Sequence, residues 1–158
     1  MRETAGSQLR PPRTRVDVWV ALALTVVGLG IACYLAFEHL TGTTTLACPE
    51  TGVVDCAKVT TSSYSRVAGV PVAYFGVVFF VALLVLELAE LRTRARANAL
   101  ARLAATSLGM VGVAYLVWAE VRLHAICLWC TAVHVITFVL FALSVFTEAL
   151  RMPEDDAP

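Results

Sequence analysis

The sequence predicts an all-α fold: an integral membrane four-helix bundle with an extracytoplasmic loop or short helix between helices 1 and 2. Composition is the first observation behind this prediction. Of the 158 residues, 59% are hydrophobic and 15% are charged, and the mean hydropathy is +0.78. A water-soluble domain of this length needs a more polar surface. The second observation is that four runs contain no Asp, Glu, Lys or Arg: 18–37, 67–86, 103–119 and 125–147.

The length of these runs suits membrane helices. A helix rises about 1.5 Å per residue, so about 20 residues cross the hydrocarbon core of a bilayer. Three of the runs reach this length, and 103–119 is at the short end of the range. Arg10, Arg13 and Arg15 precede the first run, as in a signal peptide. That run is longer than a signal core and lacks a clear small-x-small cleavage site, so we expect an uncleaved first helix.

Basic residues are distributed unequally between the connecting segments. Because positive charge favours the cytoplasmic side, both termini are expected there, with the first and third loops outside. One side would hold Arg2, Arg10, Arg13, Arg15, Arg92, Arg94, Arg96 and Arg102, and the other Lys58, Arg66 and Arg122.

The predicted organisation is a cytoplasmic tail over 1–15, a membrane domain over 16–150 and an acidic cytoplasmic tail over 151–158. The predicted location is the plasma membrane. The net charge is zero and no basic block occurs, so nucleic acid is not expected as a partner.

Four of the five cysteines are expected on the extracytoplasmic side, where disulfides form and persist. Cys48 and Cys56 lie in the first outer loop, and Cys127 and Cys130 form a Cys-x-x-Cys at the outer end of the fourth helix. A structural disulfide that staples the loop is one interpretation of the first pair. Cys33 lies inside the first helix and is expected to be a small, buried packing residue.

The Cys127-x-x-Cys130 spacing favours redox chemistry. A disulfide over so short a ring constrains the unfolded chain little, so a structural role explains it poorly. A cysteine in the first turn of a helix has its thiolate stabilised by the helix dipole, and Arg122 and His124 are expected to add to this. Zinc is an alternative, but seven residues separate Cys48 from Cys56, more than structural zinc sites usually have.

His134 continues the helix face of Cys127 and Cys130 deeper into the membrane. An ionisable residue there is a functional hypothesis, such as binding a ligand or relaying a proton. The alternative is a neutral histidine hydrogen-bonded to a neighbouring helix.

Several small residues predict local structure near the loops. The serines from Ser62 to Ser65 are expected to cap a short helix, and Pro71 suits the first turn of the second membrane helix. Close helix contacts are expected at Gly76, Gly109 and Gly112.

Taken together, these residues resemble the vitamin K epoxide reductase family, in its bacterial disulfide-forming branch. The resemblance covers about residues 15–150. The motifs that carry it are Tyr34 and His39 at the end of the first helix, Cys48-x7-Cys56, Ser62, Gly69-x-Pro71-x-Ala73-x-x-Gly76, and Cys127-x-x-Cys130.

The resemblance implies a role for each cysteine. Cys127 and Cys130 would be the active-site disulfide, with Cys130 next to a membrane quinone, menaquinone or ubiquinone. Cys48 and Cys56 would be the shuttle pair, of which Cys48 meets the partner and Cys56 attacks Cys127. The partner would be an extracytoplasmic thioredoxin-fold oxidase of the DsbA type, acting in trans. The implied function is net disulfide formation in exported proteins.

The resemblance also implies quinone-contact residues. Ser62 matches a family Ser/Thr near the quinone, and His134 would hydrogen-bond a quinone carbonyl. Animal members have an asparagine where Val72 stands and a tyrosine where His134 stands, so two polar contacts to an epoxide substrate are changed. Two alternatives remain: a quinone or epoxide reductase that uses protein thiols as donors, and a structural membrane protein with two inert disulfides.

Overall fold

The computed structural model describes residues 15–42, 47–48, 51–93 and 95–149. Except for Arg15, the predicted tails 1–15 and 151–158 lie outside the described residues. The elements in chain order are α1 (Arg15–Thr41), α2 (Cys56–Thr61), the 3-10 helix η1 (Ser63–Ser65), β1 (Arg66–Val67), β2 (Val70–Pro71), α3 (Val72–Arg92), α4 (Arg96–Leu123) and α5 (Leu128–Ala149).

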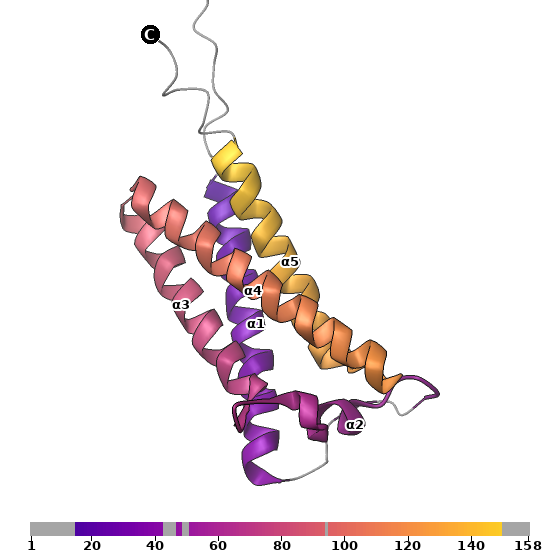
Figure 1. The fold of residues 1–158 in the computed structure, drawn as a ribbon. Helices are drawn as coiled ribbons and strands as arrows, with labels where there is room; N and C mark the ends of the chain where they lie inside the picture. The colour runs from indigo at the N-terminus through magenta and orange to yellow at the C-terminus, as the bar shows by residue number, and fades with distance from the viewer. Residues whose placement is uncertain (1–14, 43–46, 49–50, 94, 150–158) are drawn as a thin grey trace, which may run out of the picture.

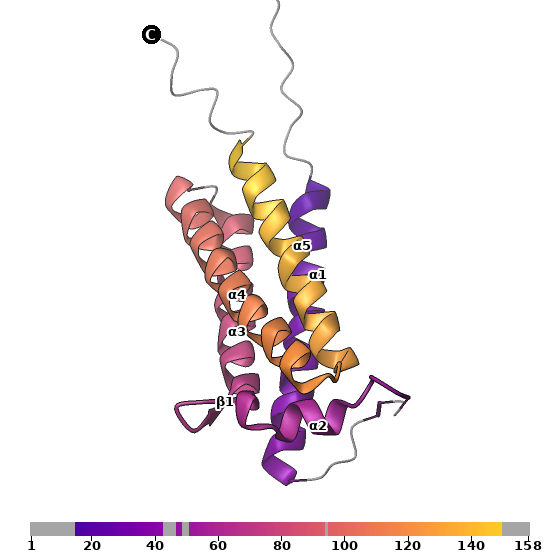
Figure 2. The ribbon, with the colours of Figure 1, turned by 45° about the vertical axis from the view of Figure 1, so that its right-hand side comes forward.

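The four long helices form an up-and-down bundle (Figure 1). α1 packs against α3, α3 against α4, α4 against α5, and α5 against α1, so the helices close into a ring. Figure 2 shows that the start of α1, the end of α5 and the α3–α4 turn share one end of the bundle, while α2 and the β1–β2 hairpin cover the other. We call the covered end the cysteine end, because Cys48, Cys56, Cys127 and Cys130 cluster there, and the other the opposite end.

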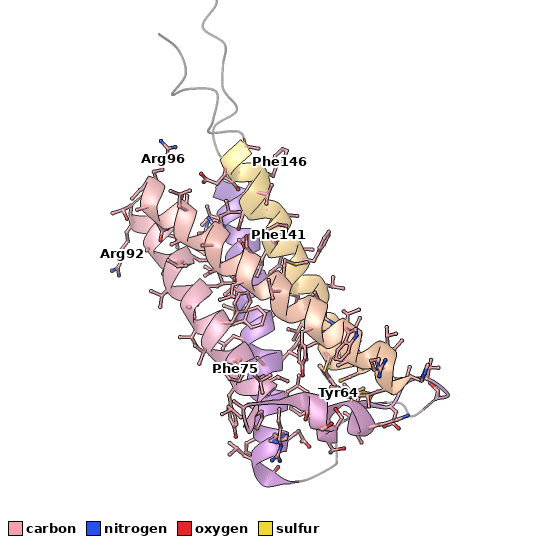
Figure 3. All side chains as sticks on the ribbon, in the orientation of Figure 1. Tyr64, Phe75, Arg92, Arg96, Phe141 and Phe146 are labelled. Carbon is pink, nitrogen blue, oxygen red and sulfur yellow. A yellow bond between two sulfur atoms is a disulfide. The ribbon has the colours of Figure 1, made fainter. Side chains whose placement is uncertain are left out.

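The bundle has the length and surface of a membrane domain. Within the described residues, four helices are long and apolar enough to cross a membrane: Asp17–Thr41, Val72–Arg92, Arg96–Leu123 and Leu128–Ala149. Large apolar side chains such as Val78, Leu108 and Phe146 stand on the outside of the bundle, which suits lipid. Arg92 and Arg96 extend from the opposite end, and Tyr64 lies at the cysteine end (Figure 3). The prediction of an all-α four-helix membrane bundle is confirmed.

Cys33 corrects one expectation. Its side chain is exposed on the outside of α1, rather than buried as a packing residue. The wrong expectation came from its position in an apolar run, which gives depth along the helix but not the face on which a residue lies.

α4 extends well beyond the charge-free run 103–119. Its first turns contain Arg102, whose Nε lies 3.1 Å from Oε1 of Glu87 on α3, and both side chains are buried. Nearby, the Asn98 side chain donates to Glu90 at 2.8 Å and to the Leu86 carbonyl at 3.1 Å. These contacts join α3 to α4 at the opposite end and allow charged residues to remain inside a membrane helix pair.

Close helix packing occurs at one of the three expected glycines and at one glycine that was not expected. A Cβ at Gly109 would lie 2.6 Å from the Phe79 ring, so Gly109 is confirmed as a contact position. At Gly76 the nearest side chain would be in ordinary contact, and at Gly112 no described atom lies within 4 Å. At Gly28, for which no close contact was expected, a Cβ would clash with the Phe80 ring.

The hairpin at the cysteine end turns through Ala68 and Gly69, which both have positive φ. Positive φ at both central residues is typical of two-residue hairpin turns, whose backbone twist matches the right-handed twist of the two strands. The chain then enters α3 directly, with Pro71 as the N-cap rather than in the first turn.

Candidate functional site

The first cysteine pair is a disulfide. The sulfurs of Cys48 and Cys56 are bonded, and their Cα atoms are 6.2 Å apart. Cys56 begins α2, where Asp55 is the N-cap and its carboxylate accepts the Lys58 N–H at 2.8 Å. Cys56 is buried, whereas Cys48 is partly exposed. The disulfide therefore has one accessible and one enclosed sulfur.

Backbone pairing brings the disulfide to the second cysteine pair. The Ile126 N–H donates to the Val53 carbonyl at 2.8 Å, and the Asp55 N–H donates to the Ile126 carbonyl at 3.1 Å. Ile126 directly precedes Cys127, and Asp55 directly precedes Cys56. As a result, both buried cysteines pack into one cluster with Val59 and Ala125, bordered by Cys48, Leu123, Trp129 and Cys130.

The segment before Cys48 is held by two aromatic residues. The Ala47 N–H donates to the hydroxyl of Tyr34 on α1 at 3.2 Å, and the Trp129 indole donates to the Ala47 carbonyl at 3.2 Å. The two rings also touch, with centroids 5.2 Å apart. Trp129, between Cys127 and Cys130, thus links the Cys-x-x-Cys to the loop disulfide.

Cys127 caps the start of α5 rather than lying within its first turn. Its carbonyl accepts the Thr131 N–H at 2.8 Å, and its sulfur accepts the Cys130 N–H at 3.4 Å. The hydrogen bond from the Cys130 thiol lowers the pKa of Cys127, and the N–H groups of Cys130 and Trp129 act in the same direction. Burial and the charge of Glu120 oppose this shift.

Arg122 and His124 do not occupy the place expected of them beside the thiol. The Arg122 guanidinium lies over the Trp118 ring, 5.8 Å from its centroid. His124 is exposed and ends α4 in the left-handed conformation, with φ 49°. The thiolate is favoured instead by the Cys130 thiol and, to a lesser extent, by the N–H groups at the start of α5, as is typical of a helix N-terminus.

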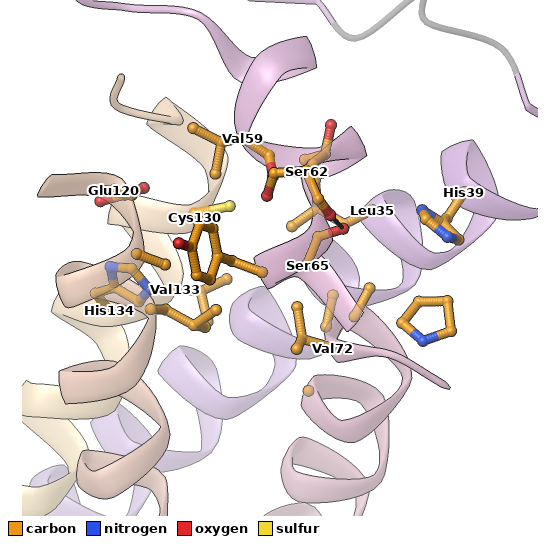
Figure 4. Close-up of a pocket in the computed structure, with 18 of the residues that line it drawn as sticks. Leu35, His39, Val59, Ser62, Ser65, Val72, Glu120, Cys130, Val133 and His134 are labelled. Carbon is orange, nitrogen blue, oxygen red and sulfur yellow. Dashed lines mark hydrogen bonds between the residues drawn. The ribbon is translucent and has the colours of Figure 1, made fainter. Parts of the chain in front are cut away.

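A cavity opens beneath the cysteine cluster, between α1, α3, α4 and α5. Its empty space is about 800 Å³, including the volume at its open mouth. The walls are mainly apolar, with Ala32, Leu35, Val72, Leu116 and Val133 among the lining residues. Figure 4 shows Glu120, Cys130 and His134 on one side, and Ser62, Ser65 and His39 on the other.

The three predicted contact residues all line this cavity, with different chemistry. His134 is buried, and its Nε2 has no hydrogen-bond partner in the described part of the chain, so the alternative of a hydrogen bond to a neighbouring helix is not seen at this nitrogen. The Ser62 hydroxyl donates to the Val59 carbonyl at 2.8 Å, which leaves its oxygen as an acceptor. Val72 contributes only apolar surface.

Glu120 is a site residue that the sequence reasoning missed. It is buried near the end of α4, lines the cavity, and its Oε1 accepts the Cys127 N–H at 3.2 Å. The signal available in the sequence was a carboxylate directly after a charge-free membrane run, seven residues before Cys127.

The fold and site define a multi-pass membrane protein with two adjoining cysteine pairs, one of which borders an apolar cavity. The family model described as the vitamin K epoxide reductase family matches residues 19–145. The chain therefore belongs to this family. Its members are oxidoreductases that use quinones or vitamin K as electron acceptors. A comparison with curated proteins gives no match.

Proposed function

We propose that this protein oxidises an extracytoplasmic thioredoxin-fold partner of the DsbA type and passes the electrons through its two cysteine pairs to a membrane quinone. This places it in the disulfide-forming branch of the family. The observation that carries the proposal is that the Cys48–Cys56 disulfide packs against Cys127 while Cys130 lines an apolar cavity.

The cavity residues fit a quinone, menaquinone or ubiquinone. A pocket with mainly apolar walls and few polar groups is typical of a small-molecule site. The buried Nε2 of His134 lacks a partner within the described residues, and a ring carbonyl is a group that this nitrogen could bind when protonated. Val72 and Val133 would pack against the ring. When bound, the quinone supplies the two-electron acceptor.

The burial of the sulfurs supports an order of thiol exchange. Cys48 is the more accessible sulfur of its pair, so it would form the mixed disulfide with the partner. Release of the oxidised partner leaves Cys48 and Cys56 as thiols. Cys56 would then attack the Cys127–Cys130 disulfide at Cys127, its neighbour in the cluster, and Cys48 would close the loop disulfide again. Each exchange moves two electrons, and the Cys127–Cys130 pair ends as a dithiol.

A reconstituted assay tests this proposal. The purified protein in detergent is mixed with a reduced thioredoxin-fold oxidase and a soluble menaquinone or ubiquinone analogue. We expect partner thiols to disappear in a 1:1 ratio with quinone reduced, and Cys130→Ala to abolish the reaction. Cys33→Ala is the matched control, because this cysteine lies outside the site, and it should keep full activity.

Other outcomes would favour the alternatives. Reduction of a vitamin K epoxide with protein thiols as donors, without oxidation of the partner, would indicate a reductase. Val72 argues against this, because it offers no polar contact to an epoxide oxygen. No exchange at any cysteine would indicate a structural protein with an inert disulfide.

A further inference from the structure

Glu120 is a carboxyl group enclosed at the junction of the cysteine cluster and the cavity. Only 8% of its surface is exposed. It binds the backbone of Cys127, the residue that begins the Cys-x-x-Cys, and it borders the cavity on the same side as Cys130 and His134 (Figure 4). An ionisable residue inside a membrane helix is costly to keep, which favours a functional reason for its presence.

We propose that Glu120 is the proton-transfer residue of this site, taking a proton from the Cys127–Cys130 dithiol and passing it to the group bound in the cavity. The inference rests on the proposed quinone-linked function and adds a proton route to it. Glu120 accepts the backbone N–H of Cys127 and also lines the cavity, so its carboxyl borders both the reacting cysteine and the space for the bound group.

The balance of the reaction requires such a route. Closing the Cys127–Cys130 disulfide removes two electrons and two protons from the two thiols. Reducing a quinone to a quinol consumes two electrons and two protons. Glu120 would accept one thiol proton, release it to a quinone oxygen and return to its carboxylate form, so it ends each cycle unchanged. The walls of the cavity are mainly apolar, and Glu120 supplies a fixed proton-binding group among them.

The charges around Glu120 support a shared proton. Its negative charge raises the pKa of Cys127, against the larger lowering by the Cys130 hydrogen bond. A carboxylate and a thiolate therefore disfavour each other here, so loss of the thiol proton favours protonation of the carboxyl. The other titratable groups that line the cavity with Glu120 are Cys130 and His134 on α5, Tyr64 on η1 and His39 on α1. The charged residues of α3 lie at the opposite end of the bundle.

A structural role is the competing explanation, because an acidic group beside a helix N-terminus also stabilises that helix. Two substitutions separate the roles. Glu120→Gln keeps an oxygen that can accept the Cys127 N–H but cannot carry a proton at neutral pH, whereas Glu120→Leu loses both properties. Glu38→Gln, on α1 at the cysteine end and away from the cavity, is the matched control.

The first measurement needs no quinone. The ultraviolet absorbance of the Cys127 thiolate is followed against pH in a Cys33→Ala, Cys48→Ala, Cys56→Ala, Cys130→Ser background, in which Cys127 is the single thiol. We expect Glu120→Gln to move the profile to lower pH, because the carboxylate no longer opposes the thiolate, while Glu38→Gln leaves it unchanged. Redox-difference infrared spectra of the protein with both site cysteines should show a carboxylic-acid band that Glu120→Gln removes. An unmoved profile together with an absent band would overturn the proposal.

The second measurement is quinone turnover. Loss of a positioned acid–base group typically costs 10²–10⁴-fold, so Glu120→Gln should slow quinone reduction by about 100-fold and Glu120→Asp should restore part of it. Exchange between the partner and Cys48–Cys56 should continue at the normal rate. Normal turnover in Glu120→Gln with a defect only in Glu120→Leu would assign a structural role. Failure of the unsubstituted protein to reduce any quinone would instead reject the proposed function, and the pH profile of the Cys127 thiolate would still test Glu120.

Discussion

Cys127 and Cys130 are three residues apart but face different surroundings. Cys127 is fully buried against Cys56, and Cys130 borders the cavity. This difference arises because Cys127 is the capping residue of α5 and Cys130 lies about one helical turn further along. The two residues are on the same side of the helix but at different depths along its axis. The geometry thus gives each sulfur a different partner.

This division predicts which disulfide accumulates when Cys130 is removed. In Cys130→Ala, Cys127 has no neighbour with which to re-form its own disulfide, so a Cys56–Cys127 bond should accumulate. Mass mapping of non-reduced digests identifies the linked peptides. A Cys48–Cys127 bond would contradict the assigned order, and so would Cys130 as the residue bridged to the loop in Cys127→Ala.

Removing Cys56 should trap an earlier step. Cys48 remains as the accessible sulfur of the loop, and it has lost the thiol that resolves its bond to the partner. The partner is supplied with only its attacking cysteine, held in a disulfide with a small thiol, and the Cys48 thiolate displaces that small thiol. Cys56→Ala should therefore accumulate a mixed disulfide between Cys48 and the thioredoxin-fold partner, visible as a larger species on a non-reducing gel. The complex should disappear in Cys48→Ala combined with Cys56→Ala.

His134 is expected to matter for the quinone and not for folding. Its Nε2 is buried without a hydrogen-bond partner in the described residues. His134→Leu therefore removes a possible hydrogen bond to the quinone ring and breaks no hydrogen bond that this nitrogen makes within the described residues. A net hydrogen bond is worth about 1 kcal/mol, so we expect roughly a fivefold to tenfold slower quinone turnover. Val135→Leu, on the outer face of α5, is the control. Unchanged quinone kinetics in His134→Leu would make His134 a packing residue.

At the scale of single residues, the sequence predicted local chemistry better than orientation. The cysteine pairs and His134 were found because their spacing is itself the signal. Cys33, Gly28 and Glu120 were misjudged or missed, because their roles depend on the rotation of α1 and α4 about their axes. These helices are apolar nearly all round, so no periodic polar face indicates which side packs inward.

At the scale of elements, α4 differs most from the sequence prediction. Its charge-free run was at the lower limit of a membrane span, yet the helix has 28 residues. The added turns are possible because Arg102 pairs with Glu87 on α3. The sequence prediction ended each membrane helix at its first charged residue. It could not anticipate that the charge of Arg102 is neutralised by a residue of the neighbouring helix.

The Glu87–Arg102 pair makes a prediction about stability. Removing one member of a buried pair leaves an uncompensated charge, which costs about 3–5 kcal/mol. Arg102→Met should therefore lower the thermal midpoint of the detergent-solubilised protein markedly. Adding Glu87→Gln removes the remaining charge and should recover part of the loss. A double variant no more stable than Arg102→Met would contradict pairing as the source of the effect.

At the scale of the whole molecule, the fold shows where the basic residues lie relative to the cysteine pairs. Arg92 and Arg96 lie at the opposite end of the bundle (Figure 3), which α1 and α5 share with the α3–α4 turn. Lys58, Arg66 and Arg122 lie at the cysteine end. The fold therefore separates the two sets of basic residues that the sequence assigned to opposite sides of the membrane, and the positive-inside rule predicts that the cysteine end faces out.

Site-specific labelling tests this orientation, and the structure selects the probe positions. Cys127 is fully buried and Cys48 is held in a disulfide, so the native cysteines report poorly. Val53 is 61% exposed in the loop at the cysteine end, and Thr93 is exposed in the α3–α4 turn. Each probe cysteine is introduced into a Cys33→Ala parent, and the parent alone gives the background labelling. A membrane-impermeant maleimide should label Val53→Cys in intact cells and Thr93→Cys only after the cells are broken. The reverse pattern would place the cysteine pairs in the cytoplasm, where reducing conditions oppose stable disulfides, and an extracytoplasmic partner could not reach Cys48.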